Sequence, residues 1–210
     1  MPAGTVVDAT LGGGGHAASI LEAHPHLDVL GIDQDTDALS AAIERLKDQR
    51  KRLRTSHRRF NEFDDALADH QITEISGALF DLGVSSPQLD RGDRGFSYRN
   101  DGPLDMRMDT RSGVTAADWI AVASEAQIAE VIKTYGEERF ARRMASAIVK
   151  VRAETPICRT KQLASIVAEA NPRWEPNKHP ATRAFQAIRI YINRELEDLE
   201  LALDPMVAKL

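Results

Sequence analysis

VVDATLGGGGH, residues 6–16, is a short apolar run that ends in an acidic residue and is followed by four glycines and the start of a helix. Glycines at such a turn let backbone N–H groups approach a ligand closely. A second acidic residue, Asp33, ends the next apolar run, about 20 residues after the glycines, where a carboxylate can bind both ribose hydroxyls of an adenosine. Together the two features predict a site for an adenosine-containing cofactor.

The spacing alone suits both NAD and S-adenosylmethionine. Asp8 and the run of four glycines favour S-adenosylmethionine. The glycine pattern fits the dinucleotide fingerprint only if Ala17 takes the place of its last glycine.

Around this stretch, the first hundred residues alternate short apolar runs with amphipathic ones, which is typical of parallel strands joined by crossover helices. We expect strands at 5–8, 28–32, 55–59 and 76–81, and helices at 16–24, 36–51 and 64–69. The sequence therefore predicts an α/β fold with an open parallel sheet.

The rest of the chain follows a different pattern. Residues 82–113 are rich in Gly, Pro, Asp and Arg and predict a long loop, and long ordered loops are usually functional. After Gly113 all elements are predicted to be helical. Two helices are capped by Thr115 and Ser124, and others span 138–152 and 160–170. Breaks at 171–172 and 176–180 precede one long helix with an apolar seam from Phe185 to Leu203.

Composition narrows the class of protein. The net charge is −5, so nucleic acid could be bound only through local basic faces. Cys158 is the only cysteine, which excludes a disulfide framework and a cysteine-based zinc cluster, and we expect no metal. No apolar run is long enough to span a membrane, so we expect a cytoplasmic location.

The block LFDLGVSSPQL, residues 79–89, leaves the carboxyl end of the fourth expected strand, the edge where open sheets bind ligands. A polar turn followed by proline can hold carbonyl and hydroxyl groups toward a flat base. The exocyclic amine of cytosine is a poor nucleophile, and an enzyme must orient it by accepting its hydrogens. Taken alone, the block is better explained as an ordinary Ser-Pro turn.

Five blocks together resemble the bacterial 16S rRNA cytosine-N4 methyltransferase family (RsmH/MraW), and the resemblance runs over essentially the whole chain. The blocks are DATLGGGGH (8–16), DLGVSSPQLD (81–90), RGFSY (94–98) with GPLDMRMD (102–109), YGEERFAR (135–142) and ATRAFQAIR (181–189).

The resemblance implies a Rossmann-like, class I S-adenosylmethionine-dependent methyltransferase that methylates the N4 amine of a cytosine in 16S rRNA of the small ribosomal subunit. Residues 1–112 would be the N-terminal part of the methyltransferase domain. Residues 113–180 would be an inserted all-helical domain for substrate recognition, and 181–210 a helix returning to the methyltransferase domain.

The resemblance also implies functional residues. The cofactor would be bound by Gly14, Gly15, His16, Asp33 at its ribose, Phe60 near its adenine, Asp81 and Gln88. Catalysis is assigned to Asp81, Ser86 and Pro87, with Asp81 and Ser86 as candidates for accepting the amine hydrogens.

Two polar patterns in the helical part are independent of the resemblance. On a helical wheel, residues 138–152 place apolar side chains on one side and basic ones on the other. The basic face suits an RNA phosphate backbone or simply a solvated surface. It consists of Arg139, Arg142, Arg143 and Lys150. Outside the helical part, a second basic run at 45–54 is explained by helix-end charges. Thr182, Gln186, Arg189 and Asn193 form a polar stripe, which we hypothesise ties the helices to the loop around Asp105 and Arg107.

The chain departs from the family pattern at both ends. Members have a segment before the first strand, continue beyond the position of Leu210, and have a seven-stranded sheet, of which four strands are expected here. We therefore expect a truncated chain with an unpaired sheet edge prone to aggregation, and weak or no cofactor binding. The alternatives are a non-catalytic rRNA-binding assembly factor and an NAD-dependent oxidoreductase, although no hydride-handling residues stand out. A homodimer is left open.

Overall fold

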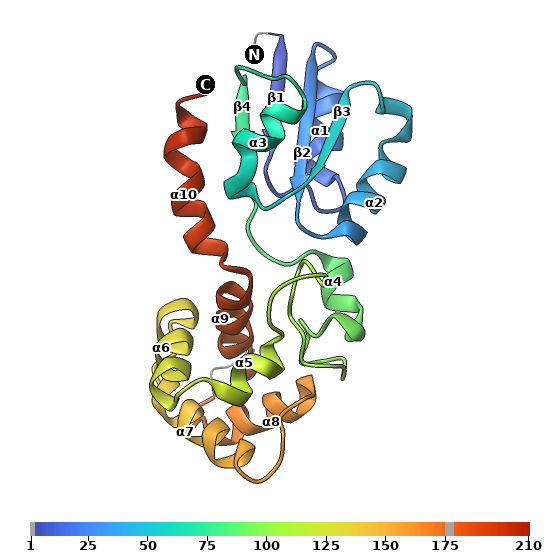
Figure 1. The fold of residues 1–210 in the computed structure, drawn as a ribbon. Helices are drawn as coiled ribbons and strands as arrows, with labels where there is room; N and C mark the ends of the chain where they lie inside the picture. Colours follow the sequence, from blue (N-terminus) through green and yellow to red (C-terminus); the bar gives the residue numbers. More distant parts are fainter. Residues whose placement is uncertain (1–2, 175–178) are drawn as a thin grey trace. The chain divides into compact units, whose positions relative to one another are not determined.

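Four parallel strands form the sheet of the first of two compact units into which the chain divides (Figure 1). The structure is a computed structural model that describes residues 3–174 and 179–210. The sheet unit comprises the described residues within 1–83 and 195–210, and the helical unit those within 84–194. The strands are β1 (Gly4–Asp8), β2 (Leu27–Asp33), β3 (Leu53–His57) and β4 (Gly77–Leu79), in the order β3-β2-β1-β4. The predicted α/β fold with a parallel sheet is confirmed.

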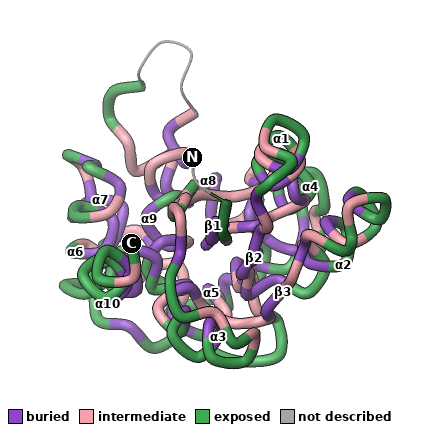
Figure 2. The backbone as a smooth tube through the Cα atoms, turned by 90° about the horizontal axis from the view of Figure 1, so that it is seen from above, coloured by how far each residue is buried: buried purple, intermediate pink, exposed green. Residues whose placement is uncertain are grey.

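Helices cover both faces of this sheet, because crossover connections between parallel strands place them there. The helices of the sheet unit are α1 (Gly15–Ala23), α2 (Thr36–Arg45), η1 (Lys47–Gln49), η2 (Phe60–Glu62), α3 (Phe63–Asp69) and α10 (Glu195–Val207). One apolar cluster joins β2 to α1 and α2, and the other joins β1 and β2 to η2, α3 and α10. β2 is buried along most of its length (Figure 2), whereas β4 is an edge strand with half-exposed residues.

β1 and β2 lie within one residue of the predicted bounds, whereas β3 and β4 differ more. β3 begins and ends two residues before the predicted 55–59, because the apolar side chain of Leu53 is buried and its backbone pairs with β2. β4 is shorter than the predicted 76–81 at both ends. Beyond Leu79 the chain leaves the ladder, and the N–H of Asp81 donates to a hydroxyl in the turn after β1 instead.

Two predictions, one between strands and one after β4, were also partly wrong. The single helix expected at 36–51 ends as α2, since the buried Leu46 lies at its C-cap and a 3-10 turn, η1, follows. The loop expected at 82–113 contains a helical turn. That turn, α4 (Ser86–Asp90), begins at a capping box in which Ser85 and Gln88 bond each other's backbone N–H.

The helical unit follows the predicted order of helices. Its elements are α4, η3 (Gly92–Arg94), α5 (Ala116–Val122), α6 (Glu125–Gly136), α7 (Ala141–Arg152), α8 (Thr160–Ala170) and α9 (Ala181–Asn193). Thr115 and Ser124 cap α5 and α6 as predicted. α7 begins three residues later than predicted, because the carboxylate of Glu138 accepts the N–H of Phe140. Of the predicted break at 176–180, residues 175–178 lie outside the described residues.

The single long helix predicted at the end of the chain is two helices. Arg194 has a left-handed backbone conformation, φ 54°, and separates α9 from α10. The predicted apolar seam fails after this break, where Leu196 and Leu203 are 41% and 44% exposed. The buried residues of α10 are instead Glu195, Asp198, Ala202 and Met206.

The compact units divide the chain differently from the three predicted segments. Residues 84–112 belong with the helices rather than with the sheet, because Phe96, Leu104 and Met106 are buried in the apolar core of the helical unit. Of the last segment, only residues 195–210 belong to the sheet unit. The role of 113–180 as an inserted substrate-recognition domain stays a prediction.

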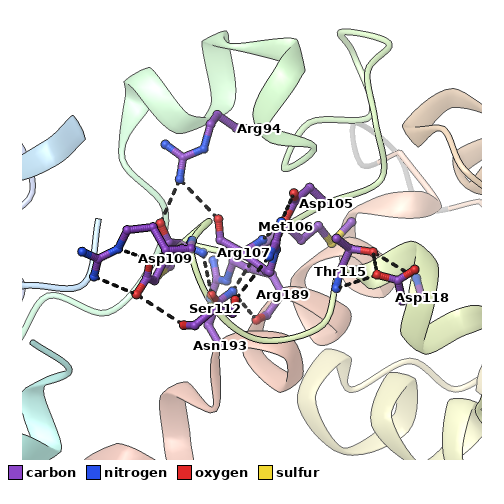
Figure 3. Close-up of polar contacts among 12 residues, drawn as sticks. Arg94, Asp105, Met106, Arg107, Asp109, Ser112, Thr115, Asp118, Arg189 and Asn193 are labelled. Atoms are coloured by element: carbon purple, nitrogen blue, oxygen red, sulfur yellow. Dashed lines mark hydrogen bonds and ion pairs between the residues drawn. The ribbon is translucent and has the colours of Figure 1, made fainter. Parts of the chain in front are cut away.

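Asn193 holds the shape of the long loop within the helical unit (Figure 3). Its carboxamide accepts the N–H of Met108 and donates to the carbonyl of Met106, each at 2.8 Å. Met106 is fully buried with φ 62°, a conformation that costs a non-glycine residue free energy unless its surroundings enforce it. The hypothesis that the polar stripe ties α9 to this loop is therefore confirmed for Asn193, whereas Gln186 is exposed.

We expect Asn193→Ala to lower the free energy of unfolding by about 2–4 kcal/mol, because it leaves a buried N–H and a buried carbonyl without partners. The matched control on the same helix is Gln186→Ala, which should change stability by less than about 0.5 kcal/mol. Urea denaturation of both variants measures the difference. Equal stabilities would show that Asn193 does not hold the loop.

Candidate active site

Three acidic residues of the sheet unit lie at the carboxyl ends of its strands. In the sheet, β2 and β3 lie on one side of β1 and β4 lies on the other. The connections therefore lead to opposite sides of β1 at this edge. In open α/β sheets, ligands bind at such a switch point. Asp8 ends β1, Asp33 ends β2, and Asp81 follows β4 by two residues.

The glycine loop, residues 12–15, joins β1 to α1 in a conformation that requires glycine. Gly12 and Gly14 have φ of 52° and 75°. A Cβ on Gly14 would also lie 3.1 Å from the Cβ of Ala42, so this glycine lets α1 and α2 approach each other. A Cβ on Gly13 or Gly15 would meet no atom within 4 Å. The loop backbone at these two positions is therefore open to a ligand.

The carboxylate of Asp33 binds this loop directly. Its Oδ2 accepts the N–H of Gly12 at 2.7 Å, and its Oδ1 accepts the N–H of Asp35 at 2.8 Å. Burial raises the pKa of Asp33 above its ordinary value, against the lowering effect of these hydrogen bonds. A carboxylate offers about four lone-pair directions, so each oxygen retains capacity for a further donor such as a ribose hydroxyl.

Asp8 is fully buried beneath the loop. Its pKa is raised from 3.8 to about 6, chiefly by burial and in smaller part by the nearby carboxylates of Asp33 and Asp81, while the backbone N–H of Thr10 and the side chain of His16 act to lower it. Its Oδ1 accepts that N–H at 3.3 Å, whereas its Oδ2 is buried without a hydrogen-bond partner among the described residues. A buried acceptor without a partner is costly, and a bound donor would relieve that cost.

Asp81 and His16 lie at the exposed side of the site. The carboxylate Oδ2 of Asp81 is 3.8 Å from Nδ1 of His16, and both side chains are more than half exposed. The backbone N–H of Asp81 donates to the hydroxyl of Thr10 at 2.7 Å, which ties the segment after β4 to the turn after β1. An exposed carboxylate held in this place can accept hydrogens from a substrate.

Phe60 begins the 3-10 turn η2, which follows β3 in the chain. It is buried in the core and packs edge-to-face against Phe80, with ring centroids 5.7 Å apart. Arg59, the preceding residue, donates to the side chain of Gln34, which follows Asp33. These residues lie just beyond the ends of β2 and β3.

The structure brings most of the predicted site residues into one unit. The sheet unit holds Gly14, Gly15, His16, Asp33, Phe60 and Asp81. Ser86, Pro87 and Gln88 lie in α4 of the helical unit, where Ser86 and Pro87 are exposed and Gln88 is buried in its capping box. Sequence reasoning left Asp8 and Thr10 out of the site. Both belong to the DATLGGGGH block, and their place beside the glycines was the sequence signal that could have assigned them to the site.

The four predicted RNA-binding residues are all exposed, three on α7 and one just before it. The opposite side of α7 buries Met144, Ala145 and Ile148. The exposed residues are Arg139, Arg142, Arg143 and Lys150.

The described ranges, 3–174 and 179–210, contain neither a metal-binding cluster nor a membrane-spanning helix. No group of three or more His, Cys, Asp or Glu residues there is arranged to hold a metal ion. No helix there is long and apolar enough to cross a membrane.

Comparison with known proteins gave one family and many relatives. Residues 1–210 match the model of the MraW methylase family. The chain is 51% identical over 211 residues to ribosomal RNA small subunit methyltransferase H of Idiomarina loihiensis, covering 100% of this chain and 66% of that protein. It is 50% identical over 210 residues to the protein of the same name from Chromobacterium violaceum, covering 100% and 65%. The chain thus spans about two thirds of the length of these relatives.

Asp8→Asn should change how stability depends on pH. The raised pKa means that protonated Asp8 contributes stability fully below about pH 3.8, and this contribution is lost as pH rises through about 6. Asparagine resembles the protonated carboxyl and does not ionise. We therefore expect the variant to match the wild type near pH 3.5 and to be more stable by about 2–3 kcal/mol at pH 7.5.

Chemical denaturation across this pH range measures the difference between the two proteins. Using the difference cancels the titration of all other groups. A constant difference from about pH 3.5 to 7.5 would show that Asp8 has the same pKa in the folded and unfolded states, against the raised pKa.

Proposed function

The chain belongs to the MraW methylase family, and from this premise we propose that it is an S-adenosylmethionine-dependent methyltransferase acting on the N4 amine of a cytosine in 16S rRNA. The relatives named above are small-subunit ribosomal RNA methyltransferases. The observation that carries the proposal is the carboxylate of Asp33, fixed by the N–H of Gly12 at the switch point of the sheet.

The residues at this edge fit an adenosine-containing cofactor. Asp33 retains acceptor capacity for the ribose hydroxyls, and the backbone at Gly13 and Gly15 is open. The ammonium group at the amino-acid end of the cofactor, directly or through one water, would supply the donor that Oδ2 of Asp8 lacks. We assign Gly14, Gly15, His16 and Phe60 to the same site, as the family resemblance implies.

S-adenosylmethionine supplies an electrophilic methyl group, and the residues of the chain would prepare the amine. The lone pair of the cytosine amine is delocalised into its ring, so the amine must be turned out of plane by acceptors for its hydrogens. Asp81, exposed beside His16, is our candidate for the first hydrogen and for the proton released on methylation. Ser86, Pro87 and Gln88, which lie in α4 of the helical unit, are assigned from the family resemblance alone, with Ser86 as the candidate for the second hydrogen.

A cytosine must be presented unpaired or flipped out to reach such a site. We propose that the basic face of α7 binds the RNA backbone around it. Arg142, Arg143 and Lys150 are exposed on a helix that contains no acidic residue, and the guanidinium of Arg139 lies over the ring of Phe140. Phosphates of the small-subunit RNA would be their partners.

Asp33→Ala should lower the affinity for S-adenosylhomocysteine, measured by calorimetric titration, by about 100-fold, because charge-assisted bonds to two hydroxyls are lost. Asp28→Ala, at the opposite end of β2 and half exposed, is the control and should bind as the wild type does. A wild-type chain that is folded but does not bind would refute the proposed cofactor site in this chain.

A triple variant of α7 should weaken binding of a single-stranded 16S rRNA fragment at low salt; it carries Arg142→Ala, Arg143→Ala and Lys150→Ala. It should also reduce the slope of log K against log salt by about two to three, roughly one per lost phosphate contact. Arg45→Ala/Lys51→Ala removes two exposed basic residues of the sheet unit and is the control. An unchanged slope in the triple variant would exclude α7 from the RNA interface.

RNA binding without methyl transfer would instead favour the assembly-factor alternative. A methylation assay on the same fragment distinguishes the two functions.

A further inference from the structure

A buried ion pair links α10 to the segment after β3. The Nε of Arg59 donates to Oδ2 of Asp198 at 2.6 Å, and the Asp198 side chain is 1% exposed. The other carboxylate oxygen, Oδ1, is buried without a hydrogen-bond partner among the described residues. The buried charge of Asp198 is therefore compensated through Arg59, and losing Arg59 would leave that carboxylate buried without its cation.

Arg59 carries this link onward to the end of β2. Its Nη1 donates to Oε1 of Gln34 at 3.3 Å, and Gln34 directly follows Asp33. The backbone carbonyl of Gln34 lies 2.9 Å from Nε2 of His57, at the end of β3. The guanidinium thus joins α10 to residues beyond the ends of two neighbouring strands, immediately before Phe60.

This position corresponds to the adenine side of the proposed cofactor site. The glycine loop and Asp81 lie at the ends of β1 and β4, on one side of Asp33. A ribose bound to Asp33, with its methyl-bearing end toward Asp81, would direct its base the other way, toward β3. Gln34 and Arg59, just beyond the ends of β2 and β3, are the residues on that side, and Arg59 leads directly into Phe60.

We propose that Asp198 is a positioning residue for the adenosine end of the cofactor. By fixing Arg59, it fixes the side chain of Gln34 and the backbone that leads into Phe60. The inference rests on the proposed function, because it assigns residues to the same cofactor site. It makes α10, more than a hundred residues after the sheet, a part of that site.

A second ion pair of the same segment provides a matched control. Lys209, just after α10, lies 3.7 Å from Asp64 on α3, and both side chains are substantially exposed. This pair also links the end of the chain to the sheet unit, but α3 carries no proposed cofactor residue. Asp64→Asn should therefore leave cofactor affinity unchanged.

The test is calorimetric titration of Asp198→Asn with S-adenosylhomocysteine and with 5′-methylthioadenosine, which lacks the amino-acid end. We expect both affinities to fall by the same factor, roughly tenfold, a usual size for coupled sites. General loosening of the site would affect S-adenosylhomocysteine more, because its amino-acid contacts would be lost as well. Thermal unfolding of each variant, with titrations run well below the transition, separates affinity from stability.

Arg59→Lys is the second variant, since lysine keeps a cation for Asp198 but has no second nitrogen to reach Gln34. It should lose affinity by a similar factor with a smaller loss of stability, and it decides the question if Asp198→Asn does not fold. If the variants unfold at lower temperature but bind both ligands as the wild type does, the inference is overturned and the proposed function is not. A folded wild type that binds neither ligand would overturn the proposed function and the inference with it.

Discussion

The hydrogen bond from the N–H of Gly12 to the carboxylate of Asp33 joins the turn after β1 to the end of β2. It can form only because the strands are parallel neighbours, so that their carboxyl ends meet at the same edge. It also requires the left-handed backbone of Gly12 and the close approach of α1 and α2 at Gly14. The shape of the proposed cofactor site therefore depends on the sheet order and on two glycines.

Two buried carboxyl groups at the same edge of the sheet lower the stability of the fold. Asp8 and Asp33 are buried near each other, and desolvation raises the pKa of both. A core built for stability alone would not place two carboxyl groups side by side at the end of a sheet. Residues that oppose folding are common where a protein binds a ligand, because the ligand supplies the missing partners.

Sequence patterns were sufficient where the signal is local. The capping residues Thr115 and Ser124 predicted the starts of α5 and α6, and alternating apolar runs located all four strands. The break at Arg194 could not be predicted, because apolar spacing continues across it and arginine has no special tendency toward a positive φ. The pairing of Arg59 with Asp198 joins positions far apart in the chain, and single-sequence periodicity carries no information about such contacts. Asp8 was visible in the sequence, but its role depends on burial, which only the fold reveals.

A titration of the 15N-labelled chain with S-adenosylhomocysteine, followed by amide NMR shifts, tests most directly whether the cofactor binds at this edge of the sheet. The account predicts that the largest shifts fall on Gly12 to His16 and on Gln34, with smaller ones at Phe60. Shifts confined to the helical unit, or none at saturating ligand in a folded chain, would contradict it.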